Sequence, residues 1–162
     1  RPIGSTLRDT RAYLARLSAA RTSAMTERGS LRMFGRPRPR HWLTAHEKSP
    51  GHTLRQHVGL SDARLLKRLQ DDPRKMNAST FASRDRAERL IDDLLQSERR
   101  TLEAWLEGSQ RSLRLDGTLP TVTGRSAFRD GHFEFVSGIR VVILRDSKMP
   151  EGFHILTSFP QP

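Results

Sequence analysis

The spacing of the apolar residues changes once along this 162-residue chain, and this change restricts the fold more than any other feature. Up to Gly108 the apolar residues recur at helical spacing, whereas from Thr121 onward they alternate with polar residues as in strands. Helices that are followed by consecutive strands predict an α+β domain with N-terminal helices and an antiparallel sheet, and not a wound α/β sheet.

Helices are expected over most of the first two thirds of the chain. The predicted segments are residues 5–27, 44–49 and 53–58, a helix capped by Ser61, and the longest helix, which Ser83 caps and which ends at Gly108. The longest helix keeps one apolar face throughout. This face consists of Ala87, Leu90, Ile91, Leu94, Leu95, Leu102, Trp105 and Leu106.

Strands are expected in the last third of the chain, after a polar loop. They cover residues 121–128, 132–136, 139–144 and 153–159, and Phe81 lies in a further short strand ahead of the longest helix. The sequence Arg-Asp-Gly between the first two of the late strands is typical of a hairpin.

The composition predicts a folded domain with a modest core, because 35% of the residues are hydrophobic and 29% are charged. The chain has no cysteine, which excludes a disulfide framework and a thiolate metal site. No apolar run approaches the length of a membrane span, and the chain opens Arg-Pro-Ile without a signal-like segment. We therefore interpret the chain as a piece of a longer protein.

The formal net charge of +11 is concentrated near the N-terminus. Residues 1–50 carry 11 Lys/Arg and 3 Asp/Glu, a balance of +8, whereas residues 51–162 carry 18 and 15, a balance of +3. Such charge suits a polyanion, although a charge run is more often a solvated face or a linker. The proline-rich stretch 35–40 cannot continue a helix and is interpreted as a linker, with an RNA-binding arm as the alternative. This divides the chain into a basic segment, residues 1–42, and a domain, residues 43–162.

Four of the six histidines, His41, His46, His52 and His57, fall within seventeen residues. Metal binding, catalysis and coincidence are the three explanations. The spacings of five, six and five residues do not place two histidines on one helical turn, and no cysteine is nearby. We therefore predict no metal site.

His57 is the histidine whose position best suits acid–base chemistry. On its short helix Leu54 and Val58 are expected to face the core, which would leave His57 at the edge of the buried face. The alternative is a structural histidine. On the next helix Arg68 lies nearest to the core side and could direct a guanidinium toward a phosphoryl group.

The last strand is expected to place Thr157 and Phe159 on one face and His154 on the opposite face. Thr157 and Phe159 would then project together into a site. The alternative is an ordinary strand whose aromatic residues belong to the core.

Five motifs occur in order over about residues 44–162. They are Gly51-His-Thr-Leu-x-x-His57-Val-Gly59, Arg68 on a short helix, Ala78-Ser-Thr-Phe81, Thr123-Gly-Arg-Ser126 and Leu156-Thr-Ser-Phe-Pro160. Taken together, this ordered set resembles the bacterial RNase A-like C-terminal toxin domain of contact-dependent growth inhibition (CdiA-type) proteins. Residues 1–42 then correspond to a generic pre-toxin segment.

The resemblance implies an RNase A-like fold without disulfides that cleaves RNA without a metal ion or other cofactor. It also implies a cognate immunity protein, export as part of a larger toxin, and action in the cytoplasm of the target bacterium. RNA is the expected substrate, with tRNA as one candidate, and the free toxin domain is expected to be a monomer.

The catalytic residues that the resemblance implies are His57, Arg68 and Thr157, which match the family in residue type. Phe159 occupies a position where the family usually has tyrosine, so the ring remains for stacking on a base but the hydroxyl is absent. The second proton-transfer group is not identified. His52 is a better candidate for it than His154.

Two substrate-binding residues, His52 and Arg125, complete the predicted site. Two other functions remain as alternatives. One is a basic nucleic-acid-binding module without activity, and the other is a metal-dependent or DNA-cleaving nuclease built from the histidine cluster. Neither alternative explains the ordered motifs at the C-terminus.

Overall fold

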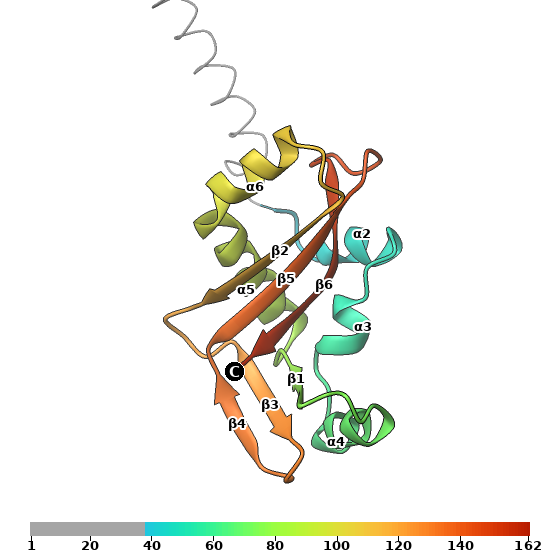
Figure 1. The fold of residues 1–162 in the computed structure, drawn as a ribbon, viewed down its shortest axis with the longest axis vertical. Helices are drawn as coiled ribbons and strands as arrows, with labels where there is room; N and C mark the ends of the chain where they lie inside the picture. The colour runs from blue at the N-terminus through green and yellow to red at the C-terminus, as the bar shows by residue number, and fades with distance from the viewer. Residues whose placement is uncertain (1–37) are drawn as a thin grey trace, which may run out of the picture. The chain divides into compact units, whose positions relative to one another are not determined.

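The computed structural model describes residues 38–162, which form helices and two three-stranded antiparallel sheets (Figure 1). The helices are α2 (Leu43–Lys48), α3 (Thr53–His57), α4 (Asp62–Asp71), α5 (Arg84–Ser97) and α6 (Arg99–Glu107). The strands are β1 (Asn77–Thr80), β2 (Ser112–Thr118), β3 (Gly124–Phe128), β4 (Phe133–Val136), β5 (Gly138–Arg145) and β6 (Phe153–Gln161). The predicted α+β class is confirmed. The helix predicted over residues 5–27 and most of the predicted linker lie outside the described residues.

The two sheets have the strand orders β1-β3-β4 and β2-β5-β6. The β3–β4 hairpin turns at the predicted Arg-Asp-Gly sequence, where Gly131 has a φ of 87°, a conformation that glycine adopts without strain. The sheets meet where the Ser79 hydroxyl of β1 donates to the Pro160 carbonyl of β6. Strand β6 therefore belongs to one sheet and contacts the other.

Strand β2 was predicted to be a loop, and this prediction was wrong. The segment is polar because it is an edge strand with a single buried position, Leu115, which lies opposite Val141. Its outward residue Asp116 instead pairs with Arg140 of β5, with 2.6 Å between the carboxylate Oδ1 and the guanidinium Nε. Leu113 and Leu115 do alternate with polar residues, but two leucines in an otherwise polar segment are a weak strand signal.

The longest predicted helix is in fact two helices, α5 and α6, which are separated at Glu98. Glu98 has left the helical region, with φ −97° and ψ 19°. The apolar face was nevertheless assigned correctly, because most of its members are buried on both sides of the break, including Leu95 and Leu102. The predicted caps are also confirmed, since Ser61 and Ser83 accept hydrogen bonds from Arg64 and Arg86.

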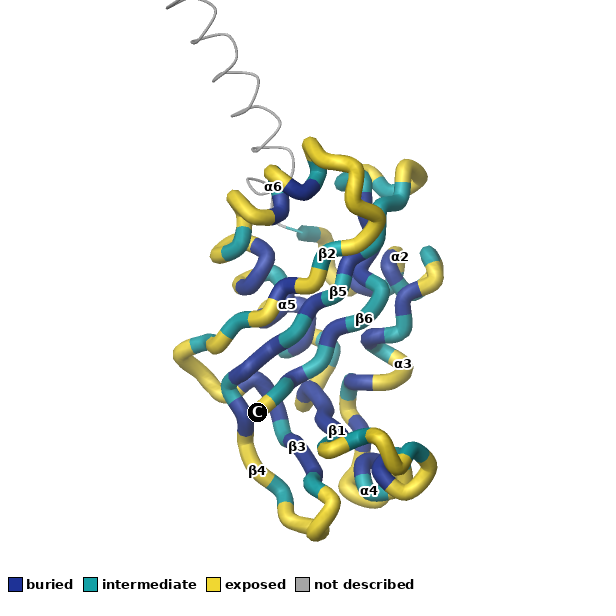
Figure 2. The backbone as a smooth tube through the Cα atoms, viewed as in Figure 1, coloured by how far each residue is buried: buried dark blue, intermediate teal, exposed yellow. Residues whose placement is uncertain are grey.

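The core has two parts. Helix α5 lies against the β2-β5-β6 sheet so closely that a Cβ on Gly117 would come within 2.5 Å of Leu94 Cδ1. Strands β5 and β6 of this sheet contain buried segments (Figure 2). Helix α4 covers β1 and β3 through a separate cluster. This cluster consists of Leu60, Leu65, Leu69, Ala78 and Ala127.

The segment from α2 to α3 runs along the outer edge of β6. Nδ1 of His46 accepts a hydrogen bond from the Ile155 amide, and the His52 amide donates to the Leu156 carbonyl, both at 2.9 Å. Gly51 lies between them, where a Cβ would be 2.5 Å from the Ile155 carbonyl oxygen. This close approach fixes α3 beside the C-terminal strand. Among the described residues, no helix is both long enough and apolar enough to span a membrane.

Candidate active site

His57 is the last residue of α3, and its side chain is only 8% exposed. The buried positions of α3 are Thr53 and His57, and not Leu54 and Val58 as predicted. The prediction was wrong because Val58 has already left the helix, with φ −127° and ψ 126°, and forms a parallel bridge with Phe81. A helical spacing from residue 54 to residue 58 therefore does not apply.

The backbone around His57 is tied to the end of β1. The Phe81 amide donates to the His57 carbonyl at 2.8 Å, and the Gly59 amide donates to the Phe81 carbonyl at 2.9 Å. The imidazole of His57 is also hydrogen-bonded to the backbone of Ser79. These contacts hold the ring in one place.

Arg68 of α4 reaches the same place. Its Nη1 lies 3.4 Å from Nδ1 of His57 and also donates to the carbonyl of Gln56. The buried residues Leu65 and Leu69 fix the helix that carries it. Arg68 thus lies beside the histidine, in a half-buried position.

The surroundings of His57 favour the neutral imidazole. Its pKa is lowered from 6.5 to about 3, with burial as the largest cause; the charge of Arg68 acts in the same direction, and the hydrogen bond to the Ser79 backbone opposes both. Burial and the neighbouring Arg64 also lower the pKa of Arg68, but a guanidinium keeps its charge in proteins. A neutral imidazole and a fixed cation therefore lie side by side.

Phe159 and Thr157 approach from β6. The ring centroid of Phe159 lies 5.0 Å from that of His57, and the Arg140 guanidinium carbon lies 5.9 Å from the Phe159 centroid. Within the described part of the chain, the buried Oγ1 of Thr157 has no hydrogen-bond partner. A buried hydroxyl without a partner is uncommon, so Oγ1 of Thr157 is a polar group that the described part of the fold leaves unsatisfied.

The prediction that His154 lies on the opposite face of the strand was wrong. Thr157 pairs with Val142 but Ile155 pairs with Ile143, so Leu156 is an extra residue in a β-bulge. The bulge returns His154 to the face of Thr157 and Phe159. Its Nδ1 lies 3.0 Å from Oδ2 of Asp146, and its side chain is buried.

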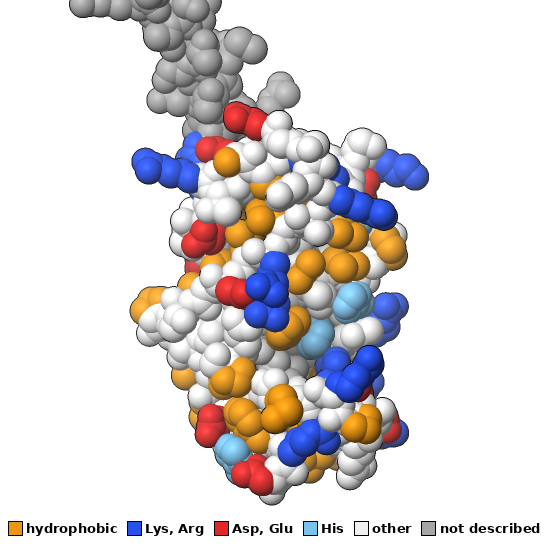
Figure 3. Space-filling view, viewed as in Figure 1, with side chains coloured by type: hydrophobic (Ala, Val, Ile, Leu, Met, Phe, Trp, Pro, Cys, Tyr) orange, Lys and Arg blue, Asp and Glu red, His pale blue; other side chains and the backbone are white. Residues whose placement is uncertain are grey.

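His52 precedes α3 and lies near His57, with 6.4 Å between the ring centroids. Burial lowers its pKa, the charges of Arg55 and Arg68 act in the same direction, and Glu47 opposes them. The structure thus brings His52, His57, Arg68 and Phe159 together. Figure 3 shows histidine side chains beside basic side chains on this face, over α3 and α4.

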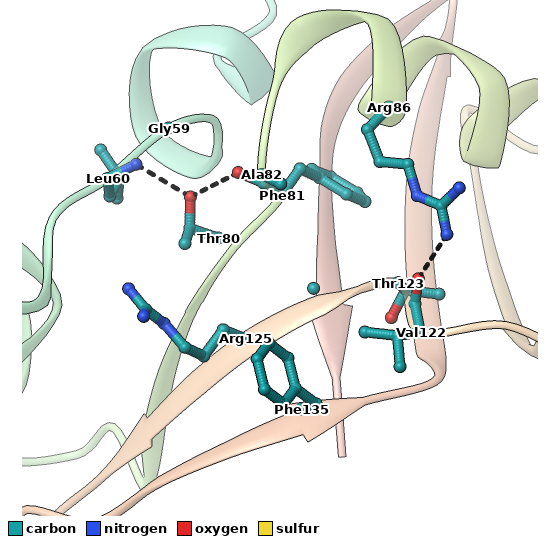
Figure 4. Close-up of a pocket in the computed structure, with 11 residues that line it drawn as sticks. Gly59, Leu60, Thr80, Phe81, Ala82, Arg86, Val122, Thr123, Arg125 and Phe135 are labelled. Atoms are coloured by element: carbon teal, nitrogen blue, oxygen red, sulfur yellow. Dashed lines mark hydrogen bonds between the residues drawn. The ribbon is translucent and has the colours of Figure 1, made fainter.

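Arg125 has no contact with this group. Its guanidinium forms an ion pair with Asp62 and lies 5.4 Å from the centroid of Phe133. It lines a separate cavity of about 440 Å³, together with Arg86 and the exposed Phe135 (Figure 4). The structure therefore places Arg125 at another surface feature from His57.

The histidines ahead of His52 have other contacts. His46 accepts the hydrogen bond from Ile155, and Nε2 of His41 lies 3.9 Å from Asp85. Within residues 38–162, no group of three or more His, Cys, Asp or Glu side chains is arranged to hold a metal ion.

Three contacts of the site were not predicted from the sequence. They involve the backbone of Ser79, the carbonyl of Gln56 and the guanidinium of Arg140. The first two are backbone groups, which carry no residue-type signal. Arg140 could have been found only from the register that pairs it with Phe159.

Comparisons with known proteins identify the family of this chain. Residues 51–160, more than half of the chain, match the family described as the bacterial CdiA-CT RNase A domain. One chain of a crystal structure of a CdiA-CT/CdiI complex from Y. kristensenii 33638 is 32% identical, with a TM-score of 0.63. The similarity covers 69% of this chain and 100% of that one. None of the curated proteins compared with the chain matches it.

The match to the family includes α3, α4 and most of β6, the three elements that carry His57, Arg68 and Phe159. It also spans the two sheets that position them. The chain therefore belongs to the bacterial CdiA-CT RNase A domain family, the ribonuclease toxin domains of contact-dependent growth inhibition.

Proposed function

We propose that this domain is a metal-independent endoribonuclease that cleaves RNA by transphosphorylation and leaves a 2′,3′-cyclic phosphate. The observation that carries the proposal is the contact between His57, held neutral by burial, and the cation of Arg68. A base and a charge that stabilises a phosphoryl group are two of the elements that this reaction needs.

His57 takes the proton of the 2′-hydroxyl. A guanidinium can only donate hydrogen bonds, so Nδ1 of His57 is the acceptor in its contact with Arg68 and the proton of the neutral ring is on Nε2. The lone pair on Nδ1 of His57 therefore faces Arg68, on the side where Arg68 would hold the scissile phosphate, and the 2′-hydroxyl has to take the place of Arg68 as its hydrogen-bond donor. The 2′-oxygen then attacks phosphorus, and the bond from phosphorus to the 5′-oxygen breaks.

The leaving 5′-oxygen needs a proton, and His52 is our candidate donor. Its pKa is lowered in the free protein, which favours the neutral ring. A bound phosphate would act in the opposite direction, because a neighbouring anion favours the imidazolium. We assign His154 no role in proton transfer, since Asp146 contacts its Nδ1 and its Nε2 is buried.

Thr157 and Phe159 position the substrate. The unpartnered hydroxyl of Thr157 supports a hydrogen bond to a base or a phosphate, and the ring of Phe159 offers a surface for stacking. The residue usual at position 159 in the family, tyrosine, would add a hydroxyl that this protein does without. Arg125 is not among the groups that we expect to contact the scissile phosphate, because its guanidinium pairs with Asp62 and lies over the ring of Phe133.

The biological setting follows from the family. A CdiA-CT/CdiI complex among the similar structures supports a cognate immunity protein for this toxin. We propose that the domain is exported as part of a larger toxin, acts on RNA such as tRNA in the cytoplasm of a target bacterium, and is a monomer when free.

The test is cleavage of tRNA and mixed cellular RNA by the full chain in excess chelator, with analysis of the 3′ ends. We expect cyclic phosphate ends from the wild type and a loss of at least about a hundredfold in His57→Ala. The control is His132→Ala, which removes an exposed histidine from the β3–β4 turn and should be fully active.

Other outcomes would favour the other functions. Chelator-sensitive cleavage would indicate a metal-dependent nuclease, and salt-dependent binding without cleavage would indicate a binding module. Deletion of residues 1–42 separates the basic segment from the domain, and we expect activity to survive it.

A further inference from the structure

A basic groove lies between α3 and α4, beside His57. It is a cavity of about 410 Å³ on the surface, and four of the residues that line it are basic. These are Arg55, Arg64, Lys67 and Arg68. Asp71 is its one acidic residue. Because Arg68 lines the groove and also contacts His57, the groove adjoins the candidate active site.

The cations of the groove fall into two kinds. Lys67 is neutralised by Asp71, with 2.8 Å between Nζ and Oδ1, and Arg68 is held by Gln56 and His57. The guanidinium groups of Arg55 and Arg64 form no hydrogen bond or ion pair with any residue from 38 to 162. Two charges in the groove are therefore without a counter-ion in this part of the chain.

Most of the other arginines among residues 38–162 form ion pairs or hydrogen bonds within the fold. Arg99 pairs with Glu103, Arg140 pairs with Asp116, and Arg145 donates to several backbone carbonyls. Arg55 and Arg64 instead add to the positive field of the site, since Arg55 lowers the pKa of His52 and Arg64 lowers that of Arg68. An anion bound between Arg55 and Arg64 would offset the effect of their charges on His52 and Arg68.

The groove is also suited to a backbone and not to a base, because none of the residues that line it is aromatic. We propose that the α3–α4 groove is a second phosphate subsite, in which Arg55 and Arg64 bind the phosphate next to the scissile one. This inference rests on the proposed function, which places the scissile phosphate at Arg68 and His57. The subsite gives the enzyme a preference for chains over dinucleotides.

The first test measures binding without cleavage. The probe is a 2′-deoxy strand of about twelve nucleotides, which lacks the attacking hydroxyl and spans a site of the usual size. We compare the full chain with the double variant Arg55→Ala/Arg64→Ala by fluorescence anisotropy at several salt concentrations. The slope of log K against log salt should fall by about 0.7, the value for one phosphate contact on a single strand.

The matched control is the double variant Arg89→Ala/Arg100→Ala, which removes the same charge from exposed positions of α5 and α6. Neither helix contributes a residue to the groove. We expect its slope to equal that of the wild type. Equal slopes for both double variants would overturn the subsite.

The second test uses cleavage. A mixture of ribodinucleoside monophosphates is compared with the same mixture carrying an additional 5′- or 3′-terminal phosphate. The extra phosphate should raise kcat/KM of the wild type about tenfold, the scale of one charge-assisted contact. Arg55→Ala/Arg64→Ala should lose this gain, so that its kcat/KM with the extra phosphate equals its kcat/KM without it.

The outcomes separate the two proposals. Failure of the wild type to cleave any RNA would remove the proposed function, while the binding test would still decide whether the groove holds a phosphate. A groove that serves only an acidic partner protein would leave both the salt slope and the gain from the extra phosphate unchanged in Arg55→Ala/Arg64→Ala. That result would overturn the inference.

Discussion

The surroundings of His57 hold its imidazole in the neutral state. Its ring is buried beside a cation, and both conditions oppose protonation. The same conditions keep its lone pair free at neutral pH, when about a quarter of unperturbed imidazoles would be protonated at a pKa of 6.5. A phosphorane dianion next to Arg68 would favour the imidazolium, so the proton affinity of His57 rises as the reaction proceeds.

Removal of the charge at Arg68 should change the titration of His57 in a known direction. Arg68 lowers the pKa of His57, so Arg68→Met should raise that pKa and move the acid limb of kcat/KM to higher pH. We also expect kcat to fall by roughly a hundredfold or more, because the phosphoryl charge loses its partner. The measurement is an NMR titration of the His57 ring.

Arg68→Lys is the companion variant, because it keeps the charge but not the planar group. We expect this variant to keep the pKa of His57 close to its lowered value but to recover little of the lost kcat. A His57 pKa that stays the same in Arg68→Met would show that burial alone sets it, and that Arg68 has no electrostatic part in the site.

At the scale of elements, the site depends on how α3 is attached to β6. Gly51 allows the backbone of the α2–α3 link to lie against Ile155, and the neighbouring His52 amide bonds to Leu156. This attachment places the end of α3 opposite Phe159. A glycine that is remote from the chemistry thereby determines the position of the base.

Gly51→Ala should therefore damage both stability and activity. Its Cβ would lie 2.5 Å from the Ile155 oxygen and 2.7 Å from the His46 oxygen, and both are backbone atoms that cannot rotate away. We expect a loss of about 1–3 kcal/mol in the free energy of unfolding, measured with urea, and at least a tenfold loss of kcat/KM.

The control for this variant is Gly108→Ala, whose Cβ would meet only the Trp105 and Ala104 oxygens at 3.5 and 3.7 Å, an ordinary contact distance. It should be close to wild type in both measurements. A Gly51→Ala variant with wild-type stability and activity would mean that the α2–α3 link is looser than the structure shows.

Elements were predictable from the sequence where one face is clearly apolar. Helices α4 and α5 and the β3–β4 hairpin have such faces or a specific turn, and their existence was predicted. Edge strand β2 buries little, the break at Glu98 leaves the apolar spacing unchanged, and the bulge at Leu156 depends on pairing with β5. The break and the bulge are not determined by residue type at one position, so the sequence pattern could not show them, whereas the short alternation of Leu113 and Leu115 in β2 was too weak to separate a strand from a loop.

At the scale of the molecule, the site is assembled from residues that are about a hundred positions apart. The sequence motifs identified four site residues individually: His57, Arg68, Thr157 and Phe159. The positions of these residues relative to one another depend on the edge of β6 and on the junction of the two sheets. Arg125 shows the limit of this approach. It lies within a matching motif, yet the fold directs it to Asp62.

The burial of a neutral histidine also affects the whole domain through the pH dependence of folding. Between about 3 and 6.5, His57 binds a proton in the unfolded chain but not in the folded one. Its contribution to the free energy of unfolding is therefore complete above its unfolded pKa and is lost as the pH falls toward the folded value. Because at most one proton is involved, the free energy of unfolding changes by at most about 1.4 kcal/mol per pH unit.

Urea unfolding of the wild type and of His57→Gln across the pH range from about 4.5 to 7 measures this contribution by difference. The wild type should lose more stability on acidification than the variant does, because glutamine does not titrate. His52 has a lowered pKa and gives a smaller effect of the same sign in both proteins, so it cancels. His132 has a raised pKa, which adds stability at low pH in both proteins and also cancels. Parallel curves for the two proteins would mean that the folded domain admits a protonated His57, and the neutral base on which the proposed mechanism depends would then have to be abandoned.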